Sequence, residues 1–326
     1  MSIEHWKPCN AKMMNLTFEI GHIPKTTPHL FADCVELLLY FENYSEISKS
    51  DLENFLIQED DIPEKWGQYE YQREIGRASK HDEIYQSIED CFTQLEYRIK
   101  AFSSFYPFFF KERVFIRYGK DELTNRHYLY TFMLICSRLR SFPKNHAQKF
   151  SSLFEKVSAQ AMKTLLPEFA KVHIFGANSA DRKTYYGTDL RVALKKLSEN
   201  ICEYPIEENI EPESSSSDAG LDIVGYIGFD DPAYGSLAFF GQCAAREYDW
   251  PQKNFEAHPH KLRAFFNFTH DPMNLIFIPV CYRQATGEWV KNSPSYGAVL
   301  LDRLRICHLL KEKALIPEVL SLFTNI

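Results

Sequence analysis

Two polar residues interrupt two neighbouring apolar segments, and their types suit metal chemistry. Asp222 lies in residues 221–227, a segment rich in β-branched and aromatic residues, and Gln242 lies near the end of the apolar segment 237–244. Turn-forming residues separate the segments, so the sequence predicts a hairpin with one polar group on each arm. Burying such a group is costly without a partner, and a hydrogen-bond donor or a metal ion could serve.

Each residue also has a purely structural interpretation. An aspartate before a run of hydrophobic residues can cap a turn, and a glutamine near a strand end can bond the backbone at a sheet edge. The sequence leaves both interpretations open.

Alternating helix and strand patterns flank the hairpin. Residues 147–166 carry apolar side chains at helical spacing, and Glu155 lies beside this apolar side. The other expected elements are a strand at 172–175, a polar loop at 176–187, a helix at 189–201, an acidic and serine-rich linker at 203–217, a helix at 253–268, a strand at 275–279 and a helix at 298–313. This order predicts an α/β (α+β) fold with a mixed sheet flanked by helices.

The first half of the chain has mainly helical patterns. The expected elements are helices at 30–42, 49–56, 81–102 and 128–139, with a strand at 113–118. Residues 141–146 break the helical pattern. We therefore expect a mostly helical domain at residues 1–145, which contacts a partner protein or nucleic acid, and a second domain at residues 146–326.

Composition narrows the class of protein. The 326 residues are 45% hydrophobic and 15% aromatic, which is enough to fill a substantial core, and the net charge of −7 argues against a generally basic nucleic-acid coat. Eight cysteines without a CxxC pair are typical of reduced thiols in the cytoplasm. We find no secretory signal pattern, no apolar run of membrane length and no Walker, GxGxxG or GxSxG motif.

A small basic group still leaves room for a local nucleic-acid contact. It consists of Arg182, Lys183, Arg191, Lys195 and Lys196, with Arg246 after the hairpin. Such a group is usually a solvated helix face, but it can also contact phosphates.

The hairpin residues resemble the PD-(D/E)XK, or restriction-endonuclease-like, nuclease superfamily. The matching residues are Gly220-Leu221-Asp222 and Gln242-Cys243-Ala244, and Glu155 fits the acidic position on the first helix of the family core. The resemblance covers roughly residues 147–310. It implies a restriction-endonuclease-like mixed sheet in which Asp222, Gln242 and Glu155 hold Mg²⁺ or Mn²⁺ for hydrolysis of phosphodiester bonds in DNA, with RNA as the alternative substrate.

The sequence departs from the family pattern at Ala244, where the family has a lysine. Either a basic residue from the next segment replaces that lysine, with Lys253 first and Arg246 second, or the domain no longer cuts and acts as an adaptor or scaffold. We expect the first alternative, a cytoplasmic Mg²⁺-dependent endonuclease. By analogy with the family, it would be the effector of a bacterial anti-phage system with protein partner subunits.

Overall fold

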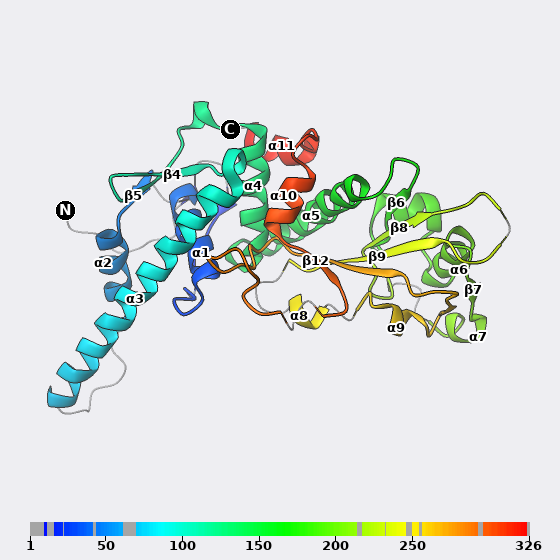
Figure 1. Cartoon of the computed structure of the whole chain (residues 1–326), viewed down its shortest axis with the longest axis horizontal. Helices are drawn as coiled ribbons and strands as arrows, with labels where there is room; N and C mark the ends of the chain where they lie inside the picture. Colours follow the sequence, from blue (N-terminus) through cyan, green and yellow to red (C-terminus); the bar gives the residue numbers. More distant parts are fainter. Residues whose placement is uncertain are drawn as a thin grey trace.

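A five-stranded mixed sheet organises the second half of the chain in the computed structural model (Figure 1). The structure describes residues 10–11, 16–21, 23–41, 44–60, 70–213, 217–231, 233–245, 250–253, 256–292 and 296–324. Across the sheet the strands are β12 (Val299–Leu301), β11 (Met273–Phe277), β9 (Leu237–Cys243), β8 (Ile223–Ile227) and β6 (Lys171–Ile174). Strands β6, β8 and β9 are antiparallel neighbours, whereas β11 is parallel to both β9 and β12.

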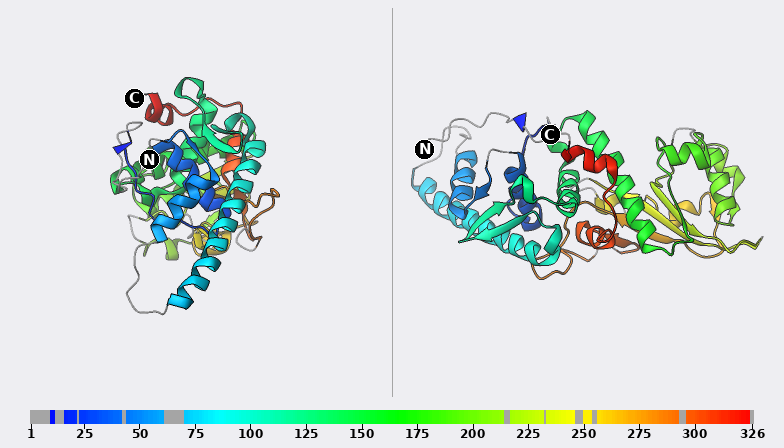
Figure 2. Two further views of the ribbon diagram at one scale, coloured as in Figure 1. Left: turned by 90° about the vertical axis from the view of Figure 1, so that its left-hand side faces the viewer. Right: turned by 90° about the horizontal axis from the view of Figure 1, so that it is seen from above.

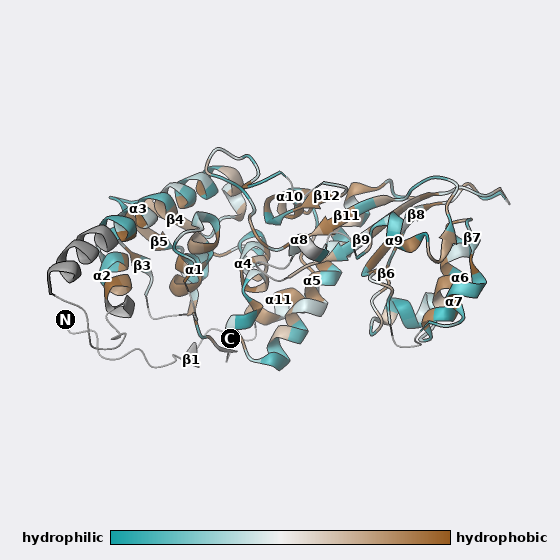
Figure 3. Cartoon of the chain, turned by 90° about the horizontal axis from the view of Figure 1, so that it is seen from below, coloured by the Kyte–Doolittle hydropathy of each residue, from teal (hydrophilic) through white to brown (hydrophobic). Residues whose placement is uncertain are grey.

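Helices cover both faces of this sheet because successive side chains of each strand point to opposite sides. Ile223 belongs to the same hydrophobic cluster as residues of α5 (Lys144–Leu165). Its neighbour Val224 belongs to a second cluster, with residues of α6 (Leu190–Asn200). Figure 3 shows hydrophilic and hydrophobic residues along both helices, as amphipathic helices require. The sheet is therefore a layer between α5 and α6.

The first half is built mainly from helices. They are α1 (Pro28–Phe41), α2 (Lys49–Asp60), α3 (Glu70–Phe102) and α4 (Asn125–Ser137). A small antiparallel sheet has the order β3 (Glu46–Ile47), β5 (Val114–Arg117) and β4 (Phe108–Lys111), and a further two-stranded sheet pairs β1 (Asn10–Ala11) with β2 (Leu16–Thr17). Three short 3₁₀ helices, η1 (Ser103–Phe105), η2 (Lys120–Glu122) and η3 (Leu139–Ser141), connect these elements.

The two halves share one hydrophobic core. The cluster that contains α1, α3 and α4 residues continues into Ile223 and Leu275 of the large sheet. The last helices, α10 (Arg303–Leu309) and α11 (Pro317–Thr324), return to the middle of an elongated molecule (Figure 2). A functional division at residue 145 stays a prediction.

Most expected elements are confirmed. Helices α1, α2, α3, α4, α5 and α6 and strands β5, β6, β8, β9 and β11 lie where the sequence predicts them, with shifted ends. Asp222 precedes β8 by one residue, so it lies just before the strand and not inside it. The mixed α/β character of the fold is likewise confirmed.

Four expectations about local structure are wrong. Residues 253–268 form no continuous helix but contain α8 (Trp250–Lys253), α9 (Pro259–Leu262) and β10 (Phe266–Asn267), because Pro259 starts a new helix behind the N-cap His258. Residues 299–301 form β12, and Asp302 caps a helix that begins only at Arg303. The expected linker at 203–217 contains β7 (Tyr204–Pro205) and α7 (Glu207–Ile210), and the expected loop at 176–187 contains a π-helical turn, η4 (Arg182–Tyr186).

Candidate functional site

The β8–β9 hairpin brings Asp222 next to the end of β9. Ile223 pairs with Gly241, and the backbone N–H of Asp222 donates to the Gly241 backbone oxygen at 3.1 Å. The backbone N–H of Cys243 donates to Asp222 Oδ2 at 2.7 Å, and the backbone oxygen of Asp222 accepts from the N–H of Phe175 at 2.7 Å. These bonds hold Asp222 at the junction of β6, β8 and β9.

Helix α5 brings Glu155 to the same junction. The helix can approach closely because the sheet offers glycines beneath Met162: a Cβ atom would lie 3.0 Å from Met162 Sδ at Gly225 and 2.9 Å from Met162 Cε at Gly241. Glu155 Oε2 would lie 3.3 Å from a Cβ atom at Gly176, the residue after Phe175. The Glu155 carboxylate therefore lies beside the end of β6.

The electrostatics of the two carboxyl groups agree with this proximity. Burial, followed by the negative charges of Asp222 and Asp218, raises the pKa of Glu155 to about 8. Burial also raises the pKa of Asp222 to about 7, although the Cys243 N–H opposes the increase. Lys253 lowers both pKa values, so its ammonium acts on both carboxyl groups. A divalent cation at this point would favour the ionised forms.

Gln242, the residue before Cys243, has a buried oxygen. Its side chain is 3% exposed, and Oε1 accepts no hydrogen bond in the structure. An unsatisfied buried amide oxygen costs about 1–3 kcal/mol. A cation ligated by this oxygen would remove that cost, so the donor set of two carboxylates and one amide fits a hard divalent ion.

Lys253 lies near the two carboxyl groups. Ala244 is completely buried, and Lys253 at the end of α8 is half-buried, 3.7 Å from Glu256 across an ion pair. Trp250, at the start of α8, is 1% exposed and packs edge-on against Tyr282 with ring centroids 4.8 Å apart. The packing of Trp250 therefore fixes the helix that carries Lys253.

Sequence reasoning missed two acidic residues. Asp218 contributes to the raised pKa of both Glu155 and Asp222, and Glu256 contributes to that of Asp222. Asp218 Oδ1 also accepts the N–H of Gly220 at 2.9 Å. Gly220 has φ +80°, and a Cβ atom there would lie 2.7 Å from the Glu256 backbone oxygen. The acid-turn-acid sequence from Asp218 to Asp222 is the signal that could have identified Asp218.

The predicted basic group does not form one surface. Arg182 corrects the expectation: it is fully buried and donates to the backbone oxygens of Phe175 and Gly187, so its guanidinium is used within the fold. Arg191 pairs with its own helix cap Asp189 at 2.6 Å, and Lys195 pairs with Glu211 at 2.7 Å. Lys183 and Lys196 are exposed, and Arg246 lies outside the described residues.

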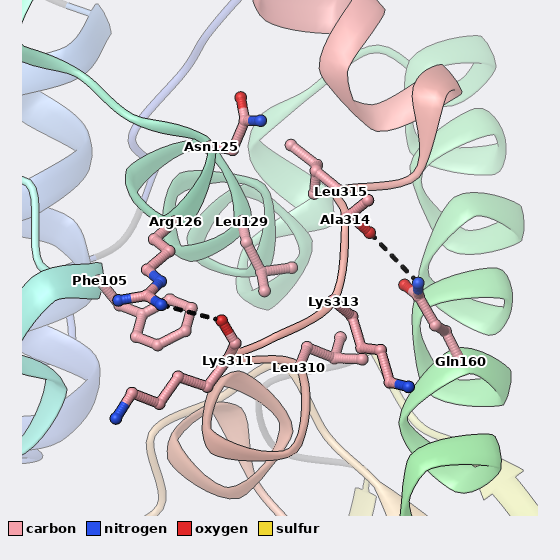
Figure 4. A pocket seen from close by; sticks show the side chains of 10 residues that line it. All are labelled: Phe105, Asn125, Arg126, Leu129, Gln160, Leu310, Lys311, Lys313, Ala314 and Leu315. Atoms are coloured by element: carbon pink, nitrogen blue, oxygen red, sulfur yellow. Dashed lines mark hydrogen bonds between the residues drawn. The ribbon is translucent and has the colours of Figure 1, made fainter.

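A separate pocket of about 150 Å³ lies between α4, α5 and the segment that joins α10 to α11 (Figure 4). Arg126 donates to the Lys311 backbone oxygen at 3.1 Å, and Gln160 donates to that of Ala314 at 3.2 Å. These bonds attach the C-terminal segment to the helices. The pocket contains none of the predicted site residues.

The raised pKa values predict how pH affects the metal-free protein. The folded state binds protons at Glu155 and Asp222 more tightly than the unfolded chain does. These two groups therefore contribute most to stability below about pH 4 to 5, and their contribution is lost as the pH rises through about 7 to 8. Replacing Glu155 with Gln removes one buried charge. At about pH 8.5 we expect this variant to be more stable than the wild type by on the order of 1–3 kcal/mol.

Urea unfolding at about pH 5 and pH 8.5 with a chelator checks this expectation. The exposed Glu199→Gln is the matched control and should track the wild type at both pH values. If the free energies of unfolding of the Glu155→Gln and wild-type proteins change equally with pH, Glu155 is not a buried carboxylate without a compensating charge.

Within the described residues, no group of three or more His, Cys, Asp or Glu side chains is arranged to hold a metal ion. Nor does any helix in those residues have the length and apolar composition needed to cross a membrane. No protein-family model, curated protein or solved structure matches the chain.

Proposed function

We propose that the protein is a metal-dependent nuclease whose residues 146–326 form a restriction-endonuclease-like domain. One observation carries the proposal: Glu155 from α5 lies close enough to Asp222 of the hairpin for the Asp222 charge to raise its pKa, and the buried amide oxygen of Gln242, the residue before Cys243, has no donor. The order of helix α5, strand β6, hairpin β8–β9 and parallel strand β11 agrees with the family core that the sequence resembles.

Glu155, Asp222 and Gln242 would hold Mg²⁺ or Mn²⁺. When bound, the ion would supply an activated water and would neutralise charge on the phosphodiester in the transition state. The Cys243 N–H keeps the Asp222 carboxylate in place, and the Lys253 ammonium provides positive charge beside it, where the negative charge of a phosphate would develop. Lys253 would thus perform the task of the lysine that Ala244 replaces.

The cellular role is proposed by analogy alone. Nucleases of this superfamily often act against foreign DNA, so we propose an effector of a bacterial anti-phage system in the cytoplasm, with the first 145 residues contacting partner subunits. The alternative is an inactive adaptor, and the observation that favours it is the fully buried Ala244 at the lysine position.

Cleavage by the purified full chain separates the two functions. The substrates are supercoiled plasmid, linear duplex DNA, single-stranded DNA and RNA, each with Mg²⁺, Mn²⁺ or EDTA. A nuclease cuts at least one of them with a divalent ion and none in EDTA. Absence of cutting under every condition, with the protein folded by circular dichroism, would support the adaptor.

A further inference from the structure

Three aromatic rings gather on the surface near the edge strand β6. His173 on β6 lies 4.1 Å from Tyr185 of η4 and 6.3 Å from Tyr226 of β8, measured between ring centroids. Tyr185 is 51% exposed, and His173 and Tyr226 are half-buried. We call His173, Tyr185 and Tyr226 the aromatic platform.

Buried neighbours fix the platform in position. Val172 and Ile174 of β6 belong to the cluster under α5, so His173 between them lies on the opposite face of the sheet. Tyr186 is fully buried and packs edge-on against Phe175 and His173, with centroids 5.0 and 5.8 Å apart. Tyr185, the residue before this anchor, is therefore held at the surface beside His173.

Lysines and one aspartate lie around the platform. Lys171 on β6, Lys163 on α5 and Lys183 on η4 are exposed. Burial lowers the pKa of His173, the charge of Asp181 opposes this decrease, and the smaller effects of Lys163 and Lys171 add to it. The Asp181 carboxylate already accepts the N–H of Ile174 at 3.1 Å.

We propose that the aromatic platform stacks unpaired nucleobases of a nucleic-acid strand, while Lys163 and Lys171 contact its phosphates. Stacking on exposed rings needs a base face that is not covered in a duplex, so the surface fits a single-stranded segment. This inference rests on the proposed nuclease function, because β6 leads from the platform to Gly176, beside Glu155. The inference specifies a single-stranded substrate. It also assigns nucleic-acid contact to the aromatic platform instead of the basic group expected from the sequence.

Binding of fluorescently labelled oligonucleotides of about 15 nucleotides, followed by anisotropy in EDTA, tests the proposal without cleavage. We expect single-stranded DNA or RNA to bind more tightly than the matching duplex, and the two single strands show which sugar is preferred. Tyr185→Ala should weaken single-strand binding by about fivefold or more, whereas Tyr185→Phe keeps the ring and should bind as the wild type does.

Tyr234→Ala is the matched control, since Tyr234 is also half exposed but stacks on Tyr204 of β7 and not on His173. Equal losses in Tyr185→Ala and Tyr234→Ala would overturn the proposal, as would a wild-type protein that binds no single strand. Because binding is measured without metal, the two proposals can fail separately. Single-strand binding without cleavage in any metal would contradict the proposed nuclease function but not the binding role of the aromatic platform. Cleavage of duplex DNA without single-strand binding would contradict the role of the aromatic platform but not the nuclease function.

Discussion

Replacing Arg303 with Met is expected to destabilise the protein by about 3–5 kcal/mol, because it leaves a buried negative charge without its partner. Arg303 is completely buried and donates to Asp33 Oδ2 at 2.8 Å, to the Pro279 backbone oxygen at 2.7 Å and to Tyr130 Oη at 3.1 Å. Arg98, also completely buried, donates to Asp33 and Glu36 at 2.7 Å each. Two arginines thus balance two carboxylates in a closed network.

The network predicts how the destabilisation can be relieved. Burial raises the pKa of Asp33, but the charges of Arg303 and Arg98 outweigh it and hold this pKa below its usual value. The double variant Arg303→Met with Asp33→Leu, which restores the charge balance, should recover part of the lost stability.

Equilibrium unfolding in urea measures both effects. Lys156→Met is the matched control, since Lys156 forms an ion pair with Glu318 at 2.8 Å on the surface, and it should cost less than about 1 kcal/mol. Arg303→Met and Lys156→Met proteins of similar stability would show that the buried network does not join the first half of the chain to α10.

Replacing Asp222 with Asn should lower metal-dependent cleavage by about 100-fold or more, a loss at the upper end of that seen when groups around a metal are removed. Asn has the same shape and can still accept the Cys243 N–H, but it carries no charge for a cation. Removing a buried carboxylate should also leave the metal-free fold at least as stable at about pH 8, so lost activity would not reflect unfolding.

Rates of cleavage at saturating Mg²⁺, compared with those of Asp230→Asn, check this expectation. Asp230 is an exposed aspartate in the β8–β9 connection with φ 55°, a conformation that Asn tolerates well. Asp222→Asn activity within a few-fold of the control would mean that the cutting does not depend on this carboxylate.

The sequence predicted the hairpin and α5 because their patterns are local. Strand-like segments on both sides of a turn identified Asp222 and Gln242, and a helical stripe with Glu155 beside it identified α5. How closely Glu155 and Asp222 approach each other is not a local property. It depends on Gly225 and Gly241, which lie beneath α5 and which the sequence shows only as strand glycines.

Other features could not be predicted from neighbouring residues. Residues 299–301 resemble the start of a helix, and they form a strand only because β11 lies parallel beside them. Arginine usually lies at the surface, yet the Arg182 guanidinium is buried and donates its hydrogen bonds to backbone oxygens in place of water. Arg303 and Asp33 are 270 positions apart, so no pattern in the sequence pairs them.

The most direct measurement is Mn²⁺ binding to the metal-free wild type and Asp222→Asn proteins by calorimetry at about pH 7, in two buffers of different ionisation enthalpy. Because the pKa of Asp222 is about 7 and that of Glu155 about 8, binding must displace protons from these carboxyl groups. We predict that the wild type binds Mn²⁺ with proton release and that Asp222→Asn binds it far more weakly. Equal affinities in the two proteins, or no binding by the wild type at millimolar Mn²⁺, would contradict a metal site between α5 and the β8–β9 hairpin.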